Sequence, residues 1–106
     1  MRSIEFHILL ALASEERHGY AILQEIAALT GGEMRLEPGT LYRALHRMLK
    51  DGWVAESARR PAADLDDERR RYYRLTPAGR RVAAAEAARL QRLVAVARAY
   101  RLLSRA

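Results

Sequence analysis

The sequence contains no cysteine among its 106 residues, which excludes disulfide bonds, thiolate catalysis and zinc–thiolate sites. It also lacks a long hydrophobic run. The apolar stretch near the N-terminus is interrupted by Glu5 and His7 and is too short for a signal peptide or a membrane span. We therefore expect a cytoplasmic protein without membrane contact.

Sequence motifs of common active sites are absent as well. The chain has no Gly-rich phosphate loop, no H-E-x-x-H metal motif and no G-x-S-x-G nucleophile elbow. The acidic run at 64–68 lacks the glycine and the ligand spacing of a calcium-binding loop. We therefore expect neither an enzyme nor a metal or cofactor site.

The composition is that of a basic globular protein. Half of the residues are hydrophobic, 30% are charged and the formal net charge is +6. A chain of this length can bury one core, and its charge favours a polyanionic partner such as nucleic acid. An ordinary basic protein can have the same charge, so charge alone does not decide.

Three short helices are predicted in the first half of the chain. Apolar residues recur at helical spacing over 3–13, with Ser3 as the expected cap, and again over 20–29. The third helix is expected over 39–51, because Pro38 suits a first helical turn and Gly52 suits a helix end.

Two strands and a long helix are predicted in the second half. Segments 53–58 and 71–76 resemble strands, and the polar segment between them predicts a hairpin with a long tip. Thr76 and Pro77 mark a helix start, and residues 80–106 contain neither glycine nor proline, which predicts a helix of ~40 Å. The predicted fold is mainly α-helical: a winged helix-turn-helix with a two-stranded wing over 1–76, then a C-terminal dimerisation helix over 77–106.

The terminal helix is too long for so small a domain to cover. It could fold back on the first helix of its own chain, or pack on the first helix of a second copy, and both can hold in part. We favour a homodimer. The expected interface residues are Ile4, Ile8, Leu90, Leu93, Val96, Ala97, Tyr100 and Leu103.

The third predicted helix has the residues of a DNA-recognition helix. Its apolar side fits a core, and its other side carries arginines that can bind guanine and polar groups that can reach phosphates. Its N-terminal amides can also meet a phosphate. The expected DNA-facing residues are Thr40, Tyr42, Arg43, His46, Arg47 and Lys50 on this helix, with Arg59, Arg60, Arg69 and Arg70 at the wing bases.

Two alternatives stay open on the residues alone. The acids at 64–68 either point away from DNA or pair with neighbouring arginines. The basic helix could also belong to a protein-interaction module that meets an acidic partner. A steep salt dependence would distinguish DNA binding from that module.

Three motifs, in this order, resemble those of PadR-type transcriptional regulators. They are HGYAILQEI at 18–26, LEPGTLYRALHRMLKDGWV at 36–54 and RRRYYRLTPAGRR at 69–81. The resemblance implies a homodimeric winged-helix repressor that binds double-stranded DNA at a two-fold symmetric promoter site. It places Tyr20, Thr40, Tyr42 and Arg43 in the family's DNA-facing motif.

The sequence departs from that family pattern at two places. Arg43 stands where many relatives carry proline, which adds a cation to the recognition helix. Drug-sensing relatives use a tryptophan on the terminal helix, whereas that helix offers Tyr100 here and Trp53 stands at the start of the first predicted wing strand. A stacking drug pocket is not expected, the effector stays open, and Trp53 is expected to pack beneath the wing.

Overall fold

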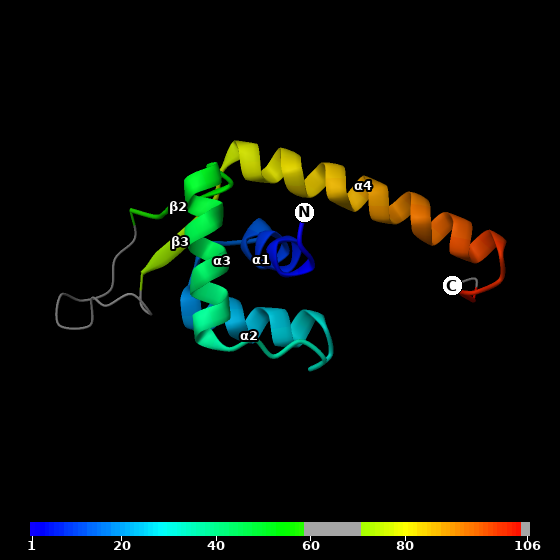
Figure 1. Cartoon of the computed structure of the whole chain (residues 1–106), viewed down its shortest axis with the longest axis horizontal. Coiled ribbons are helices and arrows are strands. Elements are labelled where there is room, and N and C mark those ends of the chain that lie inside the picture. The colour runs from blue at the N-terminus through cyan, green and yellow to red at the C-terminus, as the bar shows by residue number, and fades with distance from the viewer. Residues whose placement is uncertain (59–70, 105–106) are drawn as a thin grey trace.

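The computed structural model describes residues 1–58 and 71–104, in which a small sheet lies at one side of the helices (Figure 1). The elements are α1 (Ser3–Ala13), β1 (Arg17–His18), α2 (Gly19–Leu29), α3 (Pro38–Asp51), β2 (Val54–Glu56), β3 (Tyr72–Leu75) and α4 (Pro77–Ala99). In Figure 1, α4 starts beside the C-terminal end of α3 and runs away from β2 and β3. No helix in the described segments has the length and hydrophobicity that crossing a bilayer requires. The predicted winged helix-turn-helix is confirmed.

The helices begin and end at residues that satisfy free backbone groups. The His18 Nδ1 accepts a hydrogen bond from the Ala21 amide at 3.1 Å at the start of α2, and Thr76 Oγ1 accepts from the Gly79 amide at 3.0 Å in α4. Gly52 ends α3 with a φ of 79°, which glycine adopts without strain. The predicted positions of these helix ends are therefore confirmed to within one residue.

The cap predicted for α1 is wrong by one residue. Arg2 stands at the N-cap position, and its backbone amide donates to the Glu5 carboxylate at 2.9 Å. Ser3 is already the first helical residue. A glutamate at the third helical position can replace a short polar cap by accepting from the preceding amide.

The core lies where α1, α2 and α3 meet the sheet. Its large, fully buried side chains are Ile8, Leu9, Ile22, Ile26, Leu41, Leu45, Met48 and Val54. Each such burial contributes about 2 kcal/mol before chain entropy is counted. Trp53 is half-buried against this core beside the first wing strand, as expected from the sequence. The helix α3 is therefore held by its apolar side.

The sheet has a third strand that the sequence did not predict. β1 pairs antiparallel with β3, and β3 pairs antiparallel with β2, so the strand order is β1-β3-β2. Across this extra pairing the His18 ring meets Tyr72 edge to face at 5.4 Å. Two residues between helices cannot show an alternating pattern, so β1 has no periodic signal in the sequence.

The terminal helix ends seven residues before the predicted end. α4 stops at Ala99, and Arg101 adopts a left-handed φ of 62° while the Leu102 amide donates to Ala97 O at 2.8 Å. This wrapped end satisfies carbonyls of the last turn without a glycine. The 23 residues of α4 span ~34 Å, which stretches the molecule to 55 Å along its longest axis.

Candidate nucleic-acid interface

The two sides of α3 differ in burial as its sequence pattern predicts. The apolar residues Leu41, Ala44, Leu45 and Met48 have no exposed surface. Arg43, His46 and Lys50 are exposed, and Thr40, Tyr42 and Arg47 are half-buried at the margins of this exposed side. An exposed side with three basic-type residues, on a helix fixed from behind, can enter a groove of double-stranded DNA.

Arg43 lies back along α3 toward the N-terminal turn. Its Nη2 donates to Thr40 Oγ1 at 3.3 Å, and a Cβ at Gly39 would lie 3.3 Å from its Nη1. The missing side chain at Gly39 therefore leaves room for the guanidinium over the start of the helix. The two residues place a cation beside the N-terminal amides of α3, where an anion is already favoured.

Tyr42 joins the N-terminal turns of α2 and α3. A Cβ at Gly19 would collide with the Tyr42 hydroxyl, so the ring packs on α2 only because position 19 is glycine. The neighbouring Tyr20 is 60% exposed. The site thus brings the two predicted tyrosines to adjacent helix ends, Tyr42 partly packed and Tyr20 facing solvent.

Gly19→Ala is expected to lower the free energy of unfolding by about 1–2 kcal/mol, because the added methyl displaces the Tyr42 ring. Thermal or urea unfolding measures this change. In a Tyr42→Ala background the collision is gone, so the same substitution should cost nothing or stabilise by about 0.5 kcal/mol. An equal loss of unfolding free energy in both backgrounds would show that the Tyr42 ring is not what the added methyl displaces.

Arg47 faces a different neighbour from Arg43. Its Nε lies 3.8 Å from Glu5 Oε2 on α1, with side-chain exposures of 39% for Arg47 and 8% for Glu5. Substituting Arg47 would therefore leave a buried carboxylate without this cation. Arg47→Ala tests DNA contact and stability together, whereas Arg43→Ala changes an exposed side chain only.

The described part of the wing is tied to its surroundings by polar contacts. Arg71 pairs with Glu56 across β2 and β3 at 3.7 Å, and the buried Ser57 hydroxyl donates to the Glu16 carboxylate. The predicted wing residues Arg59, Arg60, Arg69 and Arg70 lie outside the described residues, as do the acids at 64–68.

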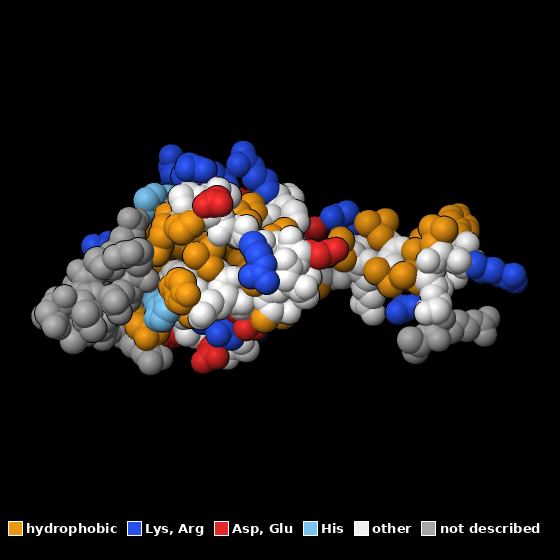
Figure 2. Space-filling model, turned by 90° about the horizontal axis from the view of Figure 1, so that it is seen from below, with side chains coloured by type: hydrophobic (Ala, Val, Ile, Leu, Met, Phe, Trp, Pro, Cys, Tyr) orange, Lys and Arg blue, Asp and Glu red, His pale blue; other side chains and the backbone are white. Residues whose placement is uncertain are grey.

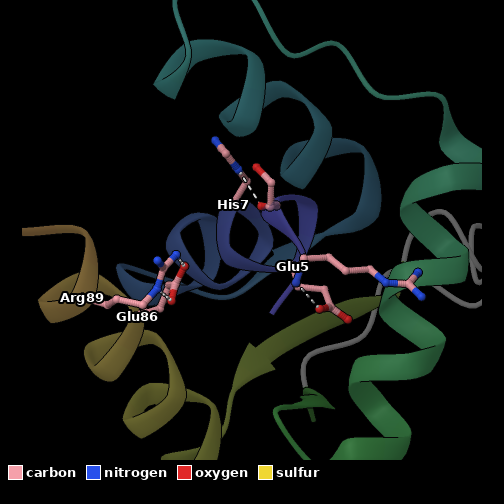
Figure 3. Close-up of polar contacts among 6 residues, drawn as sticks. Glu5, His7, Glu86 and Arg89 are labelled. Atoms are coloured by element: carbon pink, nitrogen blue, oxygen red, sulfur yellow. Dashed lines mark hydrogen bonds and ion pairs between the residues drawn. The ribbon is translucent and has the colours of Figure 1, made fainter. Parts of the chain in front are cut away.

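A groove also lies between α1 and α4. It has a volume of about 410 Å³ and is lined by Met1, Ser3, Phe6, His7, Glu86, Arg89 and Leu90. Figure 3 shows Glu86 and Arg89 together on α4 and His7 on α1. Arg89 donates to both Glu86 carboxylate oxygens at 2.8 and 2.7 Å. This hydrogen-bonded pair lowers the pKa of Glu86 and raises that of Arg89, so both stay charged near neutral pH.

Two supporting residues of the site could not be predicted from the sequence. Gly19 makes room for Tyr42, and Glu5 faces Arg47. Both contacts join residues on different helices, and no local sequence pattern predicts such a contact. The HGY motif contained Gly19 but did not reveal which side chain it accommodates.

An exposed basic helix side, a wing and a projecting C-terminal helix define a winged-helix DNA-binding protein. Residues 8–85 match the model of the transcriptional regulator PadR-like family, and the chain belongs to that family. The chain is therefore a member of a family of transcriptional regulators rather than of an enzyme family.

Known relatives agree with this assignment. The transcriptional regulator Rv3488 of Mycobacterium tuberculosis is 41% identical over 78 residues, which are 74% of this chain and 66% of that protein, just under two thirds of its length. A transcriptional regulator from Clostridium thermocellum has a similar structure, with a TM-score of 0.73, 25% identity and coverage of 92% of this chain and 88% of that one.

Two further solved structures share the fold. A PadR family regulator from Clostridium difficile has a TM-score of 0.75 at 23% identity, over 93% of this chain and 98% of that one. Bacillus subtilis PadR, solved in complex with operator DNA, has a TM-score of 0.68 at 20% identity, over 79% of this chain and 46% of that one.

Proposed function

We propose that this chain is a homodimeric repressor that binds a two-fold symmetric promoter site, with α3 of each copy in the major groove. The observation that carries this proposal is the exposed basic side of α3 on a helix whose other side is fully buried. Bacillus subtilis PadR, which shares the fold and was solved with operator DNA, supports binding to a site of the same kind. The expected cytoplasmic location follows from action on a chromosome.

The dimer part of the proposal rests on the uncovered hydrophobic side of α4. Leu93, Val96 and Tyr100 are 54%, 48% and 73% exposed, and Leu103 beyond the helix is 46% exposed. Figure 2 shows hydrophobic side chains over the projecting end of the molecule. A stripe of this kind on a soluble regulator indicates a protein partner. We propose 77–106 as the dimerisation segment and 1–76 as the DNA-binding unit.

A second copy fits this stripe better than a different protein would. Residues 77–104 carry six arginines and one glutamate, whereas residues 1–37 carry six glutamates and three arginines. The terminal helix of one copy and the first helices of another are therefore complementary in charge. Leu10, 40% exposed on α1, offers an apolar contact there.

The expected interface needs one correction. Ile8 has no exposed surface, because it packs in the core of its own chain. Its side chain has no surface to offer a partner, so Ile8 is removed from the proposed interface. Ile4, Leu90 and Ala97 are half-buried, and these three stay in the proposed interface.

The rival function is a protein-interaction module that uses the same basic surface. DNA binding predicts a logarithmic salt slope of ~0.9 per neutralised phosphate. A duplex-shift assay with the chain's own upstream region, at increasing salt, separates the two functions. No shift of any fragment at low salt would favour the interaction module.

Arg43→Ala is expected to weaken operator binding by about 10-fold, because one guanidinium contact to a base or phosphate is removed. The melting temperature should not change, since the arginine is exposed and its hydrogen bond to Thr40 Oγ1 lies at the surface. Fluorescence anisotropy with a labelled duplex measures the affinity. Equal affinities for wild type and Arg43→Ala would overturn the assignment of this residue.

A further inference from the structure

A buried glutamate lies behind the recognition helix. Glu5 on the first turn of α1 is 6% exposed, although a glutamate is rarely buried without a partner. Its Oε1 accepts from the Arg2 amide at 2.9 Å, and its Oε2 faces Arg47 Nε at 3.8 Å. Figure 3 shows Glu5 on a different side of α1 from His7.

Capping α1 does not require this carboxylate to face α3. A neutral amide oxygen or a short hydroxyl accepts the same backbone hydrogen bond. Removing a carboxylate from water is costly, and a nearby guanidinium compensates for it only when the pair is well placed. Capping alone therefore does not explain why the Glu5 carboxylate is buried facing α3. The contact with Arg47 is the remaining explanation.

The guanidinium of Arg47 is divided between a buried and an exposed part. Nε is buried and has no hydrogen-bond partner among the described residues, whereas the whole side chain is 39% exposed. An arginine side chain donates hydrogen bonds from its Nε–H and, separately, from its two Nη groups. With Nε turned toward Glu5, the exposed surface belongs to other atoms of the side chain, on the margin of the basic side of α3.

We propose that Glu5 is a positioning residue that fixes Arg47 for base recognition. Glu5 draws the Nε side inward, which restricts rotation and presents the Nη pair to the groove in one orientation. A guanidinium held in this way discriminates guanine from other bases better than a mobile arginine, which contacts any phosphate. This inference rests on the proposed function of α3.

The test compares specific with non-specific binding. Wild-type protein first enriches duplexes from a random-sequence pool, and the enriched duplex and a random duplex then serve as probes in anisotropy titrations. Glu5→Gln keeps an oxygen for the Arg2 amide and removes the charge. We expect its affinity for the enriched duplex to fall about 10-fold while its affinity for random DNA is unchanged or higher. Glu33→Gln, which removes one exposed charge after α2, should leave both affinities unchanged.

Arg47→Lys provides an independent arm, because lysine keeps the charge but lacks the Nε–H and the fork. It should lose specific affinity to a similar degree and keep its affinity for random DNA. In this background Glu5→Gln should change the ratio of the two affinities by less than about 2-fold. A parallel loss of both affinities in Glu5→Gln, or a full effect in the Arg47→Lys background, would show a purely structural role. If wild-type protein enriches no duplex, the proposed function fails, and the role of Glu5 with it.

Discussion

Leu93→Glu is expected to convert the dimer into a monomer and to weaken operator binding by about 100-fold. Leu93 lies on the projecting part of α4 and is 54% exposed in the single chain. A carboxylate there would lose its hydration if a second copy covered it, which costs several kcal/mol. A monomer engages one half-site, so the gain from simultaneous binding of two half-sites disappears. Light scattering gives the mass, and anisotropy gives the affinity.

Gln91→Glu is the matched control for this charge change. It adds the same charge two residues earlier on the same helix, at an exposed polar position. It should remain dimeric and bind DNA within about 2-fold of the wild type. A Leu93→Glu protein that keeps the dimer mass would place the interface elsewhere.

Gly79→Ala is expected to destabilise the fold by about 3 kcal/mol and to lower the melting temperature by more than about 10 °C. A Cβ at this position would collide with the Trp53 carbonyl oxygen, which is backbone and cannot rotate away. The same carbonyl accepts from the Thr76 amide at 3.1 Å and from the Thr76 hydroxyl at 3.0 Å. The methyl group would therefore separate α4 from the corner between α3 and β2. Calorimetry measures the loss.

Gly39→Ala is the comparison for this substitution. A Cβ there would meet the end of the Arg43 side chain at 3.3 Å, and that flexible group can move. The stability of Gly39→Ala should stay equal to that of the wild type or rise by about 0.5 kcal/mol, since alanine loses less conformational freedom on folding than glycine does. Similar melting temperatures for Gly79→Ala and Gly39→Ala would mean that the backbone at Trp53 shifts at little cost in stability.

The helices were predictable because their signals are local. The ends of α3 follow from Pro38 and Gly52, and its apolar residues repeat with the period of one helix. The end of α4 was not predictable in this way. Residues 100–106 contain no glycine or proline, yet Arg101 adopts a left-handed conformation that arginine rarely chooses.

The sequence was enough to predict which basic residues make up the candidate site. It was not enough to predict the contacts that hold them in place. Helical spacing was enough to expect Arg43, His46 and Lys50 on the exposed side of α3. Spacing cannot show that Arg47 faces Glu5 on α1, because that contact depends on how two helices cross. Packing between elements, rather than any single segment, decides which of the basic residues contact another helix.

The uninterrupted course of α4 has a consequence for how such a regulator could diverge. Its first turns pack on the core through Val82 and Ala83, while Leu93 lies farther along the same rigid rod. One residue inserted between them would rotate the distal surface by about 100° and shift it by about 1.5 Å. Such a change would alter the spacing and phasing of two recognition helices while each kept its own base contacts. In the proposed dimer, operator geometry and base preference can thus vary separately, the first through the length of one helix and the second through the side chains of another.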